Sequence, residues 1–323
     1  MQLVQLAGRV HHLTVVATLL VPSFASGQAM VSDKGTGVAT LQYIYFTSGD
    51  HLFSTDAIDG QSTRGYTAEG NRWYLGDTTA HTVLLYVDYG LFHRFGVSGT
   101  AAWVSSKYEG RAPVNRDVDD GSYHSSFQDF GLDARYMLLT APLNVSLSAG
   151  IGAPMTSYAN YGHAAVGRSL AEVRAGIFLA YDWTAGGALY GSAIYGVSEE
   201  LEGINLQRIT ITGGAGYNFG GRFFGELFSV YVATPNGVDW VSGDPSEPEF
   251  HGGDSTSFSA LAAVSLLNVG ASAHIFTPGN TVVALTLSST VWGENIEDGV
   301  YAGLALSYRF GKPRFKDEWG EDW

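Results

Sequence analysis

The stretch GVYAGLALSYRFG, residues 299–311, alternates between two kinds of side chain. One set is apolar and ends on an aromatic residue: Val300, Ala302, Leu304, Leu306, Tyr308 and Phe310. The other set contains small and polar residues: Tyr301, Gly303, Ala305, Ser307 and Arg309. Successive side chains of a β-strand point to opposite faces, so this pattern predicts a strand with one apolar face and one more polar face.

The same period of two recurs along most of the chain. It predicts twelve strands, near residues 37–47, 79–92, 95–107, 127–139, 143–154, 169–182, 187–197, 206–219, 221–233, 256–275, 281–293 and 299–310. Most of these segments are long enough to provide the ~9–11 tilted residues that one bilayer crossing needs. A soluble β-sandwich would instead have strands of about 5–6 residues.

The predicted connections alternate in length. Short ones rich in turn-forming residues lie near 92–94, 140–142, 184–187, 220–221 and 277–280. Longer ones lie near 48–78, 108–126, 155–168, 198–205 and 234–255, whereas the last, 293–298, is short. An even number of strands with this alternation is typical of an all-β, antiparallel, up-and-down transmembrane barrel of the bacterial outer membrane. We therefore expect residues 30–311 to form a barrel surrounded by outer-membrane lipid and lipopolysaccharide.

One segment also fits a helix. Residues 258–276, FSALAAVSLLNVGASAHIF, are rich in Ala and Leu. Asn268 and Gly270 weaken a helix, and Ser272 and His274 alternate with apolar neighbours. We favour a long strand.

Composition excludes several classes of protein. The chain has 323 residues, of which 42 are Gly and only 15% are charged, and it has no Cys. Its mean hydropathy of +0.04 is too low for a protein with several apolar membrane helices. The net charge of −14 disfavours a nucleic-acid partner, and the lack of Cys fits export through an oxidising compartment.

Both ends of the chain differ from the rest. Residues 1–29 contain Arg9, an apolar stretch at 13–21 and then small residues, which predicts a secretory signal peptide cleaved after Ala25 or Ala29. A membrane anchor is the alternative, but the apolar stretch is short and Pro22 ends it. Residues 312–323 are expected to form an acidic, Trp-containing periplasmic tail. The terminal aromatic of the preceding strand resembles the signal that the outer-membrane barrel assembly machinery recognises.

Charged residues recur on the face opposite the apolar one. We expect them to line the lumen: Asp88, Asp129, Asp133, Arg135, Glu172, Arg174, Arg208, Glu226 and Arg309. Asp133 or Arg135 could pair with Glu172 or Arg174. The alternative is a mutually neutralising network that fills the barrel, since charges inside must be paired or hydrated. Twelve strands lie between a filled barrel of eight and an open channel of sixteen to eighteen, so the lumen should be narrow or partly blocked.

Neither metal chemistry nor catalysis has a specific motif. Asp117, Asp119 and Asp120 are clustered carboxylates but do not match an EF-hand loop, and we expect no metal and no cofactor. Several His residues have Ser or Thr near them in sequence, namely His81, His124, His163, His251 and His274. No G-x-S-x-G, H-E-x-x-H or Walker-type motif occurs, so we expect no enzyme.

Several longer stretches resemble one known family. These are GDHLFSTDAIDG (49–60), LLYVDYGLFHRFGVSGTAAWVSSKYEG (84–110), SSFQDFGLDARYMLLTAPLNVSLSAGIGAPMTSY (125–158) and the ending LALSYRF (304–310). They are similar to the bacterial outer-membrane transporters labelled the phenol-degradation MetA-pathway family. The resemblance implies a barrel that passes small hydrophobic or aromatic compounds; it carries over no active residue, and the tail after Phe310 departs from the usual aromatic end.

Three hypotheses follow from the sequence. The first is an outer-membrane channel or transporter that passes a small solute, including hydrophobic or aromatic ones, through a narrow lumen. The second is a structural or interaction barrel with a closed lumen, whose acidic loops or tail bind a partner. The third is a membrane-embedded hydrolase.

Overall fold

The computed structural model describes residues 30–52, 68–69, 72–110, 115–160, 162–183, 186–201, 203–237 and 262–311. The expected signal peptide (1–29), the tail (312–323) and the first part of the strand expected at 256–275 lie outside the described residues. In the described part of the chain, no helix is long and apolar enough to cross a membrane.

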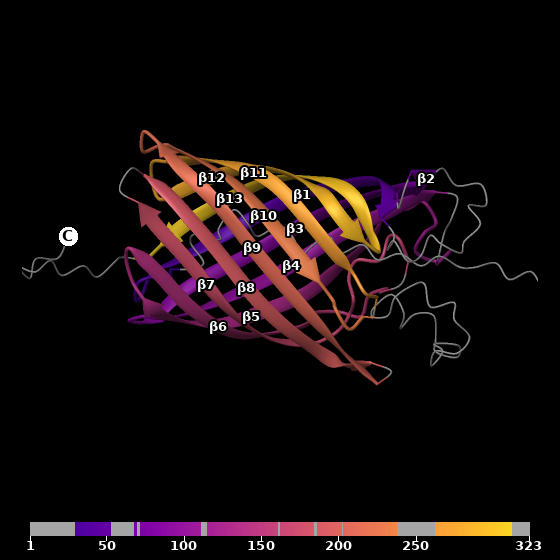
Figure 1. Ribbon diagram of the computed structural model, residues 1–323, viewed down its shortest axis with the longest axis horizontal. Helices are drawn as coiled ribbons and strands as arrows, with labels where there is room; N and C mark the ends of the chain where they lie inside the picture. The colour runs from indigo at the N-terminus through magenta and orange to yellow at the C-terminus, as the bar shows by residue number, and fades with distance from the viewer. Residues whose placement is uncertain are drawn as a thin grey trace, which may run out of the picture.

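The described strands form one antiparallel sheet that closes on itself (Figure 1). β1 is hydrogen-bonded to β3 on one side and to β13 on the other, with Gly37 opposite Phe310 at one end of the pair. Among the described strands, the two-residue β2 pairs with β3 alone. The strands are β1 (Gly37–Leu52), β2 (Ala68–Glu69), β3 (Arg72–Phe92), β4 (Phe95–Gly110), β5 (His124–Leu139), β6 (Leu143–Pro154), β7 (Glu172–Trp183), β8 (Gly187–Leu201), β9 (Ile204–Phe219), β10 (Phe223–Ala233), β11 (Ser265–Thr277), β12 (Thr281–Glu294) and β13 (Ile296–Phe310).

The two faces of the wall follow the predicted alternation. On β13, Leu304 and Leu306 are exposed, whereas Tyr301, Ala305 and Ser307 are buried inside. The same holds on β11, where Ser272 and His274 are buried, so the segment that could have been a helix is a strand. A closed wall with a continuous apolar exterior satisfies its backbone groups internally and is suited to hydrocarbon. The twelve long strands confirm the predicted transmembrane barrel.

The connections differ from the prediction at the end of the barrel opposite the short turns. We call this end the loop end, and the end that holds Gly37 and Phe310 the turn end. β8 runs to Leu201 and β9 begins at Ile204, with Leu201 opposite Ile204, so the long connection expected at 198–205 is wrong. Gly203, at φ 83°, makes this tight hairpin possible. Strand pairing continues here instead of giving way to a loop.

Segments outside the strands fold into the barrel at both ends. At the turn end, residues 31–36 run along β3: the Gly35 N–H donates to the Gly90 carbonyl at 2.9 Å, and the Gly90 N–H donates to the Thr36 carbonyl at 3.0 Å. A Cβ on Gly90 would lie 2.1 Å from the Ser32 carbonyl oxygen, so only Gly fits there. At the loop end, residues 162–167, between β6 and β7, are buried. The lumen of this barrel is therefore partly filled.

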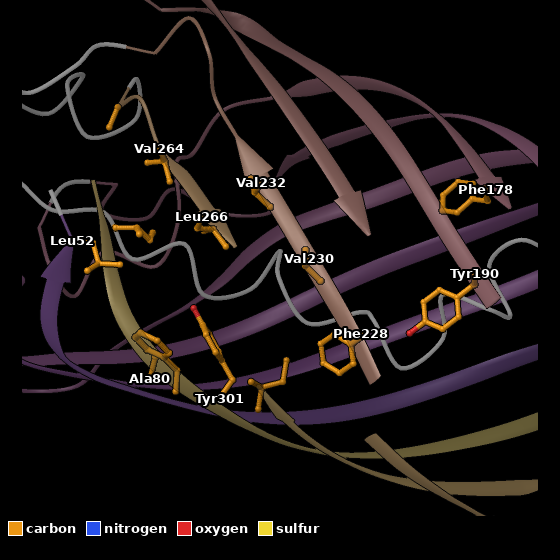
Figure 2. Close-up of a cluster of buried hydrophobic side chains, with 14 of the residues drawn as sticks. Leu52, Ala80, Phe178, Tyr190, Phe228, Val230, Val232, Val264, Leu266 and Tyr301 are labelled. Carbon is orange, nitrogen blue, oxygen red and sulfur yellow. The ribbon is translucent and has the colours of Figure 1, made fainter. Parts of the chain in front are cut away.

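The interior also contains an apolar cluster, which was not expected from the sequence (Figure 2). Its members come from β1, β3, β7, β8, β10, β11, β13 and residues 262–264: Ile44, Phe46, Leu52, Ala80, Phe178, Ala180, Tyr190, Phe228, Val230, Val232, Ala262, Val264, Leu266, Ile296 and Tyr301. We call this set the apolar wall. On β10 the inward residues Phe228, Val230 and Val232 are thus all apolar.

The apolar exterior leads to a stability prediction. Leu285, 58% exposed near the middle of β12, lies opposite Leu304 on β13, whereas Phe219, 60% exposed, ends β9 beside a turn. Arg at the bilayer midplane of a barrel costs about 2–4 kcal/mol and near an interface about 0–1 kcal/mol. We expect Leu285→Arg to lower the free energy of unfolding in lipid vesicles by the larger amount and Phe219→Arg by the smaller, as measured by urea titration. Equal effects would contradict the placement of Leu285 near the bilayer midplane and of Phe219 near its interface.

Candidate functional site

Three ion pairs follow one side of the interior. Arg174 on β7 makes two hydrogen bonds to Asp133 on β5, Nε to Oδ1 at 2.8 Å and Nη2 to Oδ2 at 2.6 Å. Arg208 Nη2 on β9 donates to Glu172 Oε1 at 2.6 Å. The third pair joins Arg135 on β5 to Asp88 on β3. We call these six residues the charge belt. Because each charge has an opposite partner, the belt can face a confined interior without a large desolvation cost.

Glycines on the intervening strands make room for the belt. Asp133 and Arg174 lie opposite the same residue, Gly150 on β6, which separates their strands. A Cβ on Gly150 would lie 2.1 Å from Asp133 Oδ1. Likewise, a Cβ on Gly196 would lie 2.6 Å from the Glu172 carboxyl carbon. The belt side chains therefore lie flat along the wall and meet across a strand that has no side chain at that level.

Asp129 is held by a tyrosine. The Tyr158 hydroxyl donates to Asp129 Oδ1 at 2.5 Å and accepts a hydrogen bond from the Ser169 N–H at 2.9 Å. Burial raises the pKa of Tyr158 well above its usual value, so the hydroxyl keeps its proton and acts as the donor. The contact also attaches the segment between β6 and β7 to β5.

Arg168 is the fourth arginine at this site, and it is not among the lumen-lining residues predicted from the sequence. It lies in the segment between β6 and β7, and its Nη2 reaches the Ala262 carbonyl oxygen at 3.4 Å. Its Nη1 is buried and has no hydrogen-bond partner among the residues that the structure describes. Burial lowers its pKa to about 9, so the guanidinium keeps its charge at neutral pH.

A cavity of about 260 Å³ separates the charge belt from part of the apolar wall. Arg168 and Asp129 also line it, together with Val230 and Val232 of β10 and Val264. The space therefore has charged groups along one side and valines along another. A cavity that combines apolar walls with convergent polar groups is typical of small-molecule sites, and its volume lies just below their usual ~300–1,000 Å³.

Residues 162–167 close part of the loop end. The His163 ring stacks on Tyr108 with 3.9 Å between ring centroids, and His163 Nδ1 lies 3.7 Å from Glu297 Oε1. The Ala164 N–H donates to Asp119 Oδ1 at 2.9 Å. Asp119, which the sequence placed in an acidic cluster, thus anchors this inward segment. In the described ranges, no group of three His, Asp or Glu side chains could hold a metal ion.

The residues expected in the lumen fall into three groups. Six line the cavity: Asp129, Asp133, Arg135, Glu172, Arg174 and Arg208. Asp88 and Glu226 are buried inside the barrel but do not line the cavity. Glu226 Oε1 lies 3.1 Å from His274 Nε2. Arg309 is outside the cavity and exposed, because it lies at the end of β13, where the wall no longer encloses it.

His124, which has both a serine and an aspartate beside it, does not have the geometry of a hydrolase triad. His124 Nε2 lies 3.0 Å from Asp120 Oδ1 and 3.2 Å from Ser122 Oγ. In a catalytic triad, the acid and the nucleophile bond to different ring nitrogens, whereas here both approach the same one. His81 contacts tyrosine hydroxyls, and His251 lies outside the described residues.

No protein-family model matches the sequence, and no curated protein matches it either. Among solved structures, an outer-membrane channel from Pseudomonas putida F1 has a TM-score of 0.63 at 12% identity, covering 88% of this chain and 98% of that one. The NanC porin has a TM-score of 0.47 at 8% identity, covering 84% and 98%. The CymD monoaromatic hydrocarbon channel has a TM-score of 0.39 at 10% identity, covering 90% and 91%. At these identities, the first similarity shows a shared fold, that of outer-membrane channels, and the other two carry no further argument.

The glycines beneath the belt lead to a mutational prediction. Gly150→Ala places a Cβ against Asp133, and overpacking of this kind costs typically about 1–3 kcal/mol. Gly99→Ala is the matched control, because the nearest atom to a Cβ there is 3.8 Å away. We expect urea unfolding in vesicles to show a clear loss of stability for Gly150→Ala and little change for Gly99→Ala. Equal stability of both variants would show that the belt does not depend on this gap.

Proposed function

We propose that this chain is an outer-membrane channel that passes small solutes through a narrow lumen. The observation that carries the proposal is the two-sided cavity inside a closed barrel with an apolar exterior. Paired charges and polar side chains can stay hydrated or contact a solute, while the valines of the apolar wall accept apolar groups. We place the turn end, with its short connections, on the periplasmic side and the loop end on the outer side of the membrane, as is usual for barrels of this class.

The filled interior limits the size of the solute. Residues 162–167 occupy the loop end, and the apolar wall narrows the lumen between β10 and β1. General diffusion of large hydrophilic molecules is inconsistent with that arrangement. The valines support an apolar or aromatic part in the solute, as does the resemblance to the phenol-degradation MetA-pathway transporters. We infer no enzymatic activity, and we expect lipopolysaccharide and the barrel assembly machinery as partners.

A closed structural barrel is the second candidate. The filled interior also supports this candidate, because the interior residues His163, Ala164 and Phe46 are almost completely inaccessible to solvent. The cavity would then be an internal void, and the loops would carry the function. Flux measurements distinguish the two candidates.

The proposed function predicts flux that depends on residues 162–166. We expect purified protein in liposomes to pass small solutes, with rates that fall steeply as solute size increases. Replacing residues 162–166 with Gly and Ser removes the stacking on Tyr108 and should raise the rate. Asp117→Gly, in an exposed turn, is the control and should leave the rate unchanged. No flux of any tested solute by either protein would contradict the channel.

A further inference from the structure

We propose that the cavity binds small monocarboxylates with a compact apolar body, the carboxylate at Arg168 and the apolar part against Val230, Val232 and Val264. This inference rests on the proposed function and names the class of solute. It assigns Arg168 the role of recognising an anion, which neither the charge belt nor the apolar wall can perform.

The other three arginines of the cavity already have anionic partners. Arg174 is bonded twice to Asp133, Arg208 is bonded to Glu172, and Arg135 is paired with Asp88. A solute anion would have to displace a carboxylate from any of them. Among the described residues, the Arg168 guanidinium has one long contact, from Nη2 to the Ala262 carbonyl oxygen at 3.4 Å, and its Nη1 has no hydrogen-bond partner there. It is therefore the arginine with donors to spare.

Asp129 does not serve as the counterion of Arg168. Its Oδ1 is occupied by the Tyr158 hydroxyl at 2.5 Å, and no ion pair joins Asp129 to Arg168 in the described part of the chain. Tyr158 is held in turn by the Ser169 N–H, one residue after Arg168. The carboxylate is fixed on the β5 side, while the guanidinium extends the other way, to residue 262.

The guanidinium lies where the charged and apolar sides of the cavity meet. Arg168 reaches the carbonyl of Ala262, which belongs to the apolar wall, and Val264 follows two residues later. Val264, Val230 and Val232 all line the same cavity as Arg168. A ligand with an anionic group at Arg168 therefore has its remaining atoms beside valines.

This combination selects one class of ligand. Two donors of a guanidinium match the two oxygens of a carboxylate, and such charge-assisted bonds are the stronger ones. A neutral hydrocarbon would leave the Arg168 donors unused, and a sugar acid would bring hydroxyl groups against the valines without partners. The volume of about 260 Å³ restricts the apolar body to a small one, such as a single ring.

Binding measurements on the purified full-length mature protein test the inference. The probes are benzoate, its neutral counterpart benzyl alcohol, and acetate, which has the carboxylate without the ring. We expect benzoate to bind most tightly. Arg168→Met should weaken benzoate binding about 10- to 100-fold, the range for loss of a hydrogen bond to a charged group, and should leave benzyl alcohol unchanged. Arg309→Met, outside the cavity, should bind benzoate like the unaltered protein.

Val232→Asn tests the apolar half. It should weaken benzoate and benzyl alcohol but leave acetate unchanged, with folding checked for each variant by the heat-dependent shift in gel mobility. Equal binding of benzoate and benzyl alcohol, or full benzoate binding by Arg168→Met, would overturn the inference. Liposome flux of a small neutral solute, measured in parallel, separates the two proposals. If the neutral solute passes but the protein does not bind benzoate in preference to benzyl alcohol, only this inference is rejected. If no solute passes, the channel is rejected.

Discussion

The rest of the structure depends on one constraint. In a hydrocarbon layer, every backbone N–H and C=O needs a hydrogen-bond partner within the protein. The pairing of β1 with β13 meets this need by closing the sheet, so that no strand edge faces lipid. Once the wall is closed, alternate side chains must point to lipid or to the interior. The outward set can only be apolar, and the inward set is then left to determine what the barrel does.

Twelve strands enclose a space that is too wide for wall side chains alone to fill and too narrow for a large aqueous pore. This chain fills it unevenly. Charges pair across Gly150 and Gly196 on one side, and aromatic and aliphatic side chains pack together on the other. Val31 and Ser32 at the turn end and residues 162–167 at the loop end take up more of the space. The cavity is what remains between these parts, and its two-sided character follows from the difference between the strands on either side of it.

The sequence was sufficient to predict what repeats along the chain. The outward faces, the number of long strands and the pairing of Asp133 with a basic residue on β7 all follow from a period of two. Part of the apolar wall was missed because inward residues such as Ile44 and Phe46 lie within continuous apolar runs, here Tyr43–Phe46, which have no alternation to detect. Arg168 and Tyr158 were missed because a loop that folds into a barrel has no periodicity. The hairpin at Gly203 was missed because polar residues such as Glu199 suggested a loop. Strand pairing nevertheless extends beyond the apolar part of these two strands, as far as Leu201 and Ile204.

The central claim is that solutes pass between the charge belt and the apolar wall. Because the chain contains no Cys, single cysteines can be introduced and modified without side reactions. Ser192 on β8 lines the cavity, and its neighbour Ala193 points outward to lipid. The account predicts that a small, membrane-impermeant thiol reagent reacts with Ser192→Cys in liposomes and blocks solute flux, while the same treatment leaves flux through Ala193→Cys unchanged. Modification of Ser192→Cys without any loss of flux would contradict it.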